Sequence, residues 1–144
     1  MFADFLKRLT DPSPEPLADT DARKAIGALL VRVARSDGDY SATEISRIDR
    51  ILGQRFGLGP FEAAELRGEC EQIEAEAPDT VRFTRAIKDS VPLDDRKAVV
   101  RAMWEVVLAD GERDAAEDQL MRIVAPLLGL TDQDSHSIRL SITG

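Results

Sequence analysis

The 144-residue chain has one cysteine and one histidine, and only 5% of its residues are aromatic. The single cysteine, Cys70, excludes an intrachain disulfide. Any histidine-based zinc site, and any Ser-His or Cys-His catalytic pair, would have to use His136. Cys70 falls on an apolar helical stripe, where we expect a small buried hydrophobe, and His136 falls in a polar segment, where we expect a surface side chain.

Long apolar runs are also missing. No uninterrupted run approaches the roughly 20 residues that a membrane-spanning helix needs. The N-terminus has Asp4 where a signal peptide would have basic residues, and no long apolar stretch follows it. We therefore expect a cytoplasmic protein without a transmembrane segment.

The chain has fewer basic than acidic residues, 19 against 27, and its net charge is −8. An acidic chain repels phosphate backbones unless its basic residues gather on one face, and here they are scattered, so we expect no nucleic-acid binding. Cations, or basic patches on partner proteins, are the natural counterpart of such a surface. The length suits one domain with its own core.

Residues 1–19 differ from the rest of the chain. Four large apolar residues at helical spacing predict a short amphipathic helix over residues 2–9: Phe2, Phe5, Leu6 and Leu9. Three prolines then predict an extended linker: Pro12, Pro14 and Pro16. We expect the short helix to dock on the main domain, residues 20–144, with a partner or a membrane surface as the alternatives.

An acidic loop occurs twice in the chain. Asp37-Gly38-Asp39 returns as Asp110-Gly111-Glu112 after 73 residues, and Glu44 returns as Glu117 at the same displacement. Each copy follows one apolar helical run and precedes another. The glycines are expected to end the first helix of each copy. Ser41 with Glu44, and Asp114 with Glu117, are expected to form capping boxes that open the second helix.

Helical periodicity and helix breakers predict about seven helices besides the short N-terminal one. Because no segment alternates with period two, we predict an all-α fold in a single compact domain. The helix that Asp94 should cap is apolar around most of its circumference and is expected at the centre. Pro126 should kink the helix after Asp114. The predicted helix over 61–76 carries a glutamate-rich face that we expect to be solvated: Glu62, Glu65, Glu69, Glu71, Glu74 and Glu76.

The two helix–loop–helix copies resemble the TerB family, the tellurite-resistance proteins of bacteria. The resemblance rests on a repeated A-D-G-[DE]-x-[SD]-x-x-E motif in an acidic helical chain and covers roughly residues 20–140. The first copy departs from it only in having Ser36 at the alanine position. The resemblance implies an all-helical fold, a role in bacterial stress responses, and a divalent cation such as Ca²⁺ on the acidic motif. By position, the implied metal ligands are Asp37, Asp39, Glu44, Asp110, Glu112 and Glu117.

The residues themselves leave two interpretations of these loops open. Helix capping explains the glycines and the capping boxes, but it does not explain Asp37 and Asp110, which stand at helix C-termini where the helix dipole disfavours negative charge. Either each carboxylate accepts hydrogen bonds from the next helix, or it faces a cation. The spacing is not that of an EF-hand, whose loop needs acids at its first, third and fifth positions and glycine at its sixth.

Three functional classes follow. The first is a non-enzymatic binding module for a divalent cation, another protein, or both. The second is a helical scaffold without a metal site, in which the acidic loops are purely structural. The third is a carboxylate-dependent enzyme, for which the chain offers acids but neither a Gly-rich phosphate loop nor an H-E-x-x-H motif.

Overall fold

The computed structural model describes residues 19–36, 38–77, 80–109 and 115–143. Seven helices fill these ranges: α2 (Asp19–Arg35), α3 (Ala42–Phe56), α4 (Pro60–Glu76), α5 (Val81–Ser90), α6 (Leu93–Val107), α7 (Ala115–Leu127) and α8 (Asp132–Thr143). The described ranges contain no strand, which confirms the all-α prediction. The predicted helix over 2–9 and the proline linker lie outside the described residues.

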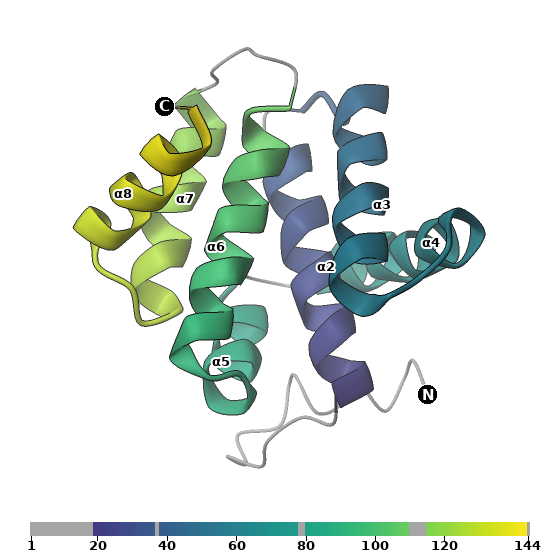
Figure 1. Ribbon diagram of the computed structural model, residues 1–144, viewed down its shortest axis with the longest axis horizontal. Coiled ribbons are helices and arrows are strands. Elements are labelled where there is room, and N and C mark those ends of the chain that lie inside the picture. Colours follow the sequence, from purple (N-terminus) through teal and green to yellow (C-terminus); the bar gives the residue numbers. More distant parts are fainter. Residues whose placement is uncertain (1–18, 37, 78–79, 110–114, 144) are drawn as a thin grey trace.

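Two helices, α2 and α6, pack against each other in the middle of the bundle (Figure 1). α2 also contacts α3, α4, α5 and α7, and α6 also contacts α3, α5, α7 and α8. The prediction that α6 is central is therefore confirmed, but α2 shares the position. Small residues on α2, such as Ala25 and Ala28, are fully buried and let neighbouring helices approach closely.

α3 and α7 end in the same way, which extends the repeat beyond the acidic loops. Gly57 and Gly129 both adopt left-handed backbone conformations, with φ of 66° and 84°. The following leucine then donates its N–H to a carbonyl five residues back: Leu58 to Gly53 and Leu130 to Ala125, each at 2.9 Å. This 6→1 bond with glycine at the turn is the Schellman termination.

Pro126 lies in the last turn of α7, which ends one residue later at Leu127, so the proline marks the end of the helix. Its counterpart in the repeat, Gly53, does not weaken α3 enough to end it, because α3 continues to Phe56.

One predicted helix start is wrong in detail. α6 begins at Leu93 with Pro92 in the N-cap position, so Asp94 lies inside the first turn and does not cap the helix. Thr80 occupies the N-cap position of α5 but makes no capping bond there; its hydroxyl accepts a hydrogen bond from Arg32 Nη1 at 3.3 Å instead.

No helix in the described ranges is both long enough and apolar enough to cross a membrane.

Candidate functional site

The first acidic loop joins α2 to α3 at one end of the bundle (Figure 1). α2 ends at Arg35, and Gly38 turns the chain with φ of 82° while its N–H donates to the Arg35 carbonyl at 3.0 Å. The predicted role of Gly38 at the end of this helix is confirmed, since only glycine adopts this conformation at little cost. Asp39 follows and is exposed. Asp37 lies outside the described residues.

The predicted capping box at the start of α3 is confirmed. Ser41 Oγ accepts a hydrogen bond from the Glu44 N–H at 3.1 Å, and the Ser41 N–H donates to Glu44 Oε1 at 3.0 Å. Unlike most capping glutamates, Glu44 is almost completely buried, with 1% of its surface exposed. The carboxylate is thus fixed inside the fold directly beneath the loop.

Glu117 holds the equivalent position in the second copy. It lies in the first turn of α7, and only 2% of its surface is exposed. α6 ends and α7 begins at the end of the bundle that carries the first loop (Figure 1). Asp110, Glu112 and the predicted cap Asp114 lie outside the described residues. The structure therefore places two equivalent glutamates, one from each copy, in buried positions at the same end of the fold.

Tyr40 braces the first loop against α4. Its hydroxyl donates to Glu71 Oε2 at 2.7 Å, and Arg67 binds the same carboxylate oxygen at 3.0 Å. The Arg35 guanidinium lies 5.0 Å from the centre of the Tyr40 ring. Burial, and next the hydrogen bond to Glu71, raise the pKa of Tyr40 well above its usual value, so the phenol stays protonated and keeps donating.

The prediction that the glutamate-rich face of α4 is solvated is wrong for two of its six residues. Glu71 and Glu74 are partly buried and pair with arginines, whereas four glutamates of that face are exposed, as predicted: Glu62, Glu65, Glu69 and Glu76. No motif or periodicity in the sequence indicated a role for Tyr40. Its only signal was its position, directly after the acidic loop.

The donor set fits a hard cation by chemistry. All six predicted ligands are carboxylates, which Ca²⁺ and Mg²⁺ prefer. Within the described residues, no group of three or more His, Cys, Asp or Glu side chains is placed to hold a metal ion. Three of the six predicted ligands are among the residues outside those ranges: Asp37, Asp110 and Glu112.

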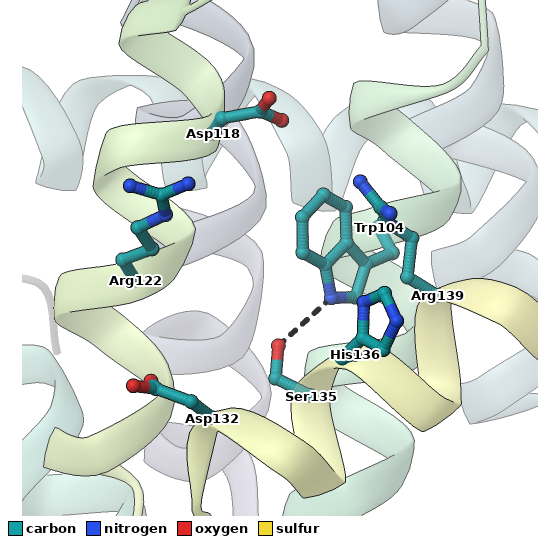
Figure 2. Close-up of a pocket in the computed structure, with 7 residues that line it drawn as sticks. All are labelled: Trp104, Asp118, Arg122, Asp132, Ser135, His136 and Arg139. Carbon is teal, nitrogen blue, oxygen red and sulfur yellow. Dashed lines mark hydrogen bonds between the residues drawn. The ribbon is translucent and has the colours of Figure 1, made fainter.

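A separate groove of about 350 Å³ lies between α7 and α8, with Trp104 of α6 at its base (Figure 2). Asp118 and Arg122 line it from α7. Four residues line it from α8: Asp132, Ser135, His136 and Arg139. His136 is exposed here, as predicted. Nothing in the sequence pattern signals the groove, because it depends on how three helices pack.

Comparison with known proteins gives one finding. The family model described as tellurite resistance protein TerB matches residues 23–140. No curated protein and no solved structure matches the chain. The matched range contains both acidic loops and all seven described helices, apart from the first residues of α2 and the last of α8.

Proposed function

The chain belongs to the TerB family, and on that premise we propose that it is a cytoplasmic binding module of a bacterial response to tellurite and other toxic agents. We propose further that its two acidic loops hold a divalent cation such as Ca²⁺. The observation that carries this proposal is the burial of Glu44 and Glu117, equivalent carboxylates of the two copies, at one end of the bundle.

Burial of a carboxylate opposes folding unless hydrogen bonds or a cation compensate for the lost hydration. A capping box explains the contact between Glu44 and Ser41, but it does not require the glutamate to be buried. A divalent cation would offset the negative charge that both copies concentrate at this end of the fold. The ligands would be the loop acids Asp37, Asp39, Asp110 and Glu112, together with Glu44 and Glu117. They would supply oxygen coordination and no redox chemistry.

Binding, and not catalysis, is the proposed activity. His136 is exposed on α8, far along the chain from the first acidic loop. Cys70 is fully buried, and burial raises the pKa of its thiol to about 12, so it is not a nucleophile at neutral pH. The two side chains most often used in nucleophile–base pairs are therefore poorly placed for that chemistry.

The proposal is tested by thermal unfolding of chelator-stripped protein in the presence of Ca²⁺, Mg²⁺, Mn²⁺ or Zn²⁺. A ligand that binds only the folded form, at a hundredfold excess over its Kd, stabilises it by about 2.7 kcal/mol. We expect a selective rise in Tm with one hard cation and its loss in the Asp37→Asn/Asp110→Asn double variant. Asp89→Asn, which removes an exposed acid on α5, serves as the matched control and should keep the full rise.

Ser41→Ala separates capping from cation binding. It removes the capping hydroxyl of α3 and keeps all six carboxylates, so it should lower Tm by the cost of one cap, about 1 kcal/mol, and leave the cation-dependent rise intact. If no cation at millimolar concentration changes Tm, while the double variant still lowers it, the loops are purely structural and the metal proposal is wrong.

A scaffold is the second candidate, and one observation favours it. Phe61 at the start of α4 is 80% exposed. Close to it in the chain, Pro60 and Ala63 line a largely apolar groove of about 350 Å³ between α3 and α4. Exposed aromatic residues next to apolar grooves are typical of protein interfaces. In this case loop-acid variants should lower stability without changing the affinity for a partner protein.

A further inference from the structure

We propose that the groove between α3 and α4 is the docking site of the chain's own N-terminal segment, residues 2–9, which lie outside the described residues. The groove is the one that the scaffold candidate would offer to a partner protein, but the proposal does not depend on that function. It lies toward the end of α3 that is opposite the first acidic loop, and it shares none of the six predicted metal ligands. The argument for this occupant comes from the groove, the segment, the connection between them and their charges.

The groove offers an apolar surface. Five of its lining residues are apolar or glycine: Gly53, Leu58, Gly59, Pro60 and Ala63. Asp49 also lines the groove, but its carboxylate pairs with Arg67, which compensates its charge. Phe61 follows Pro60 at the start of α4, and its exposed fraction, 80%, is the largest of the large apolar side chains in the described ranges. Exposed apolar surface of this kind is typical of a site that another segment covers.

Residues 2–9 carry apolar side chains at the spacing with which helices bind to grooves. The four side chains stand at positions i, i+3, i+4 and i+7: Phe2, Phe5, Leu6 and Leu9. This is the anchor spacing of an amphipathic helix that lies in an apolar groove. A helix of about eight residues is too short to be stable alone in water, so a segment with this pattern is expected to fold only against a surface.

The connection between the segment and α2 is long enough to reach the groove. The Arg23 guanidinium, four residues into α2, lies 5.0 Å from the centre of the Phe56 ring, so α2 begins beside the end of α3 (Figure 1). Leu58, two residues after Phe56, already lines the groove. Residues 10–18 form the connection, and nine extended residues span about 30 Å. A tether of this length holds the segment at a millimolar effective concentration, so modest contacts are enough for docking.

The charges of the two surfaces are complementary. Residues 2–9 contain two basic residues, Lys7 and Arg8, and one acidic residue, in a chain whose net charge is −8. Glu62 is exposed at the start of α4. A Cβ on Gly59 would lie 3.8 Å from Glu62 Oε1, which places this carboxylate at the edge of the groove. A basic side chain of the docked segment would meet it there, which favours one orientation of the segment more than it adds affinity.

The test uses the full-length protein with a nitroxide spin label attached at Ala3→Cys. Cys70 is fully buried, and burial raises the pKa of its thiol to about 12, so only the new cysteine reacts with the label. We expect the NMR signals of the backbone amides over residues 53–63 to broaden, and those around Asp39, beyond the other end of α3, to stay sharp.

Variants in the segment test which residues dock. Phe5→Ser/Leu6→Ser should lower the ratio of docked to free segment at least about tenfold and remove most of the broadening, because two apolar anchors are lost. Leu17→Ser makes the same kind of change outside residues 2–9 and serves as the control, so it should keep the broadening.

Phe61→Ser tests the groove from the other side. The ring is exposed, so its removal leaves the core in place, and we expect the ratio of docked to free segment to fall about tenfold. Val81→Ser, which removes an exposed apolar side chain from α5, is the matched control and should keep the broadening. Far-UV circular dichroism checks that each variant keeps its helices.

The proposal is overturned if the amides over residues 53–63 broaden no more than those around Asp39, or if Phe5→Ser/Leu6→Ser broadens them as the parent protein does. Equal loss of broadening in Phe61→Ser and Val81→Ser would contradict the assigned groove. Spin-labelled protein is also mixed with isotopically enriched protein that carries no label. Broadening of the groove signals in this mixture would assign the groove to the segment of a second copy and contradict docking within one chain. These outcomes do not involve a cation, so they leave the test of the acidic loops unaffected.

Discussion

Arg32 on α2 donates from Nε to Glu74 Oε2 on α4 at 3.0 Å, in a position where both side chains are mostly buried. The same guanidinium donates from Nη2 to the backbone carbonyls of Glu74, at 3.0 Å, and Ala77, at 3.1 Å. It also lies 5.3 Å from the centre of the Phe83 ring on α5. α4 has no glycine at its C-terminus, so Arg32 satisfies carbonyls that a left-handed cap would otherwise cover.

Arg32→Lys should therefore be strongly destabilising although it keeps the charge. A lysine ammonium cannot present the planar fork that reaches a carboxylate, a hydroxyl and two carbonyls together. We expect a loss of about 2 kcal/mol in the free energy of unfolding, measured by urea denaturation, because buried acceptors on α4 lose their donors. Arg85→Lys on the exposed side of α5 should change it by less than about 0.5 kcal/mol. Equal stability of the two variants would contradict the assigned role of Arg32.

The contacts of Arg32 with α4 and α5 could not be predicted from the sequence. Helix positions follow from local signals: the capping box at Ser41, Pro60 at the first turn of α4 and the glycines that turn the chain are all readable from a few neighbouring residues. The glutamates of α4 were predicted to form a solvated face, but Glu71 and Glu74 pair with arginines. The basic face of α2 lies against the acidic face of α4. Because these residues are far apart in the sequence, the periodicity within each helix does not predict their contact.

The candidate site, too, could be predicted from the sequence only in part. The repeat placed Glu44 and Glu117 in equivalent positions from spacing alone, but only the fold shows that both are buried. The capping box between Thr131 and Asp134 was missed because aspartate stands in place of the usual Glu or Gln at its third position.

Gly27 and Gly68 are both inside helices, yet substitution to alanine should have opposite effects at the two positions. A Cβ on Gly27 would lie 2.3 Å from Cys70 Sγ, whereas a Cβ on Gly68 would meet nothing within 4 Å. Alanine is favoured over glycine in helices by about 1 kcal/mol. We expect Gly68→Ala to raise the free energy of unfolding by roughly 0.5–1 kcal/mol and Gly27→Ala to lower it by roughly 1–3 kcal/mol, as overpacking does. Urea denaturation of both variants measures the difference.

The clash at Gly27 has its own control. Cys70→Ala removes the sulfur that the new methyl group would meet, so the Gly27→Ala/Cys70→Ala variant should be more stable than the sum of the two single changes predicts. The coupling should exceed about 1 kcal/mol. Additive effects would mean that α2 is destabilised at Gly27 for a reason other than contact with Cys70.

Tyr40→Phe tests the brace between the first acidic loop and α4. The variant keeps the ring under Arg35 and removes only the hydroxyl that donates to Glu71 at 2.7 Å. We expect a loss of about 1 kcal/mol in the free energy of unfolding. In a Glu71→Met background no side-chain oxygen is left to accept the bond, and the same change should cost less than about 0.5 kcal/mol. An equal cost in both backgrounds would assign the effect to packing of the ring and not to the hydrogen bond.

Asp134 should make the start of α8 sensitive to acid. The Thr131 N–H donates to Asp134 Oδ2 at 3.2 Å, and this bond, with a smaller effect of the Thr131 hydroxyl, holds the pKa of Asp134 below its usual value. Because the folded pKa is depressed, its contribution to stability is complete above the unfolded value of about 3.9 and is lost as the pH falls through the folded value.

Asp134→Asn resembles the protonated state at every pH, since a neutral amide accepts the Thr131 bond more weakly than a carboxylate does. The Tm of the wild type should therefore exceed that of Asp134→Asn at pH above about 5, and the gap should close as the solution is acidified below the folded pKa. Thermal unfolding across this pH range measures the gap. Asp89→Asn, at an exposed position on α5, should show no comparable gap at any pH. A gap for Asp134→Asn that stays constant into strong acid would mean that the substitution disturbs the helix start for steric reasons, and that the charge on Asp134 contributes nothing to the cap.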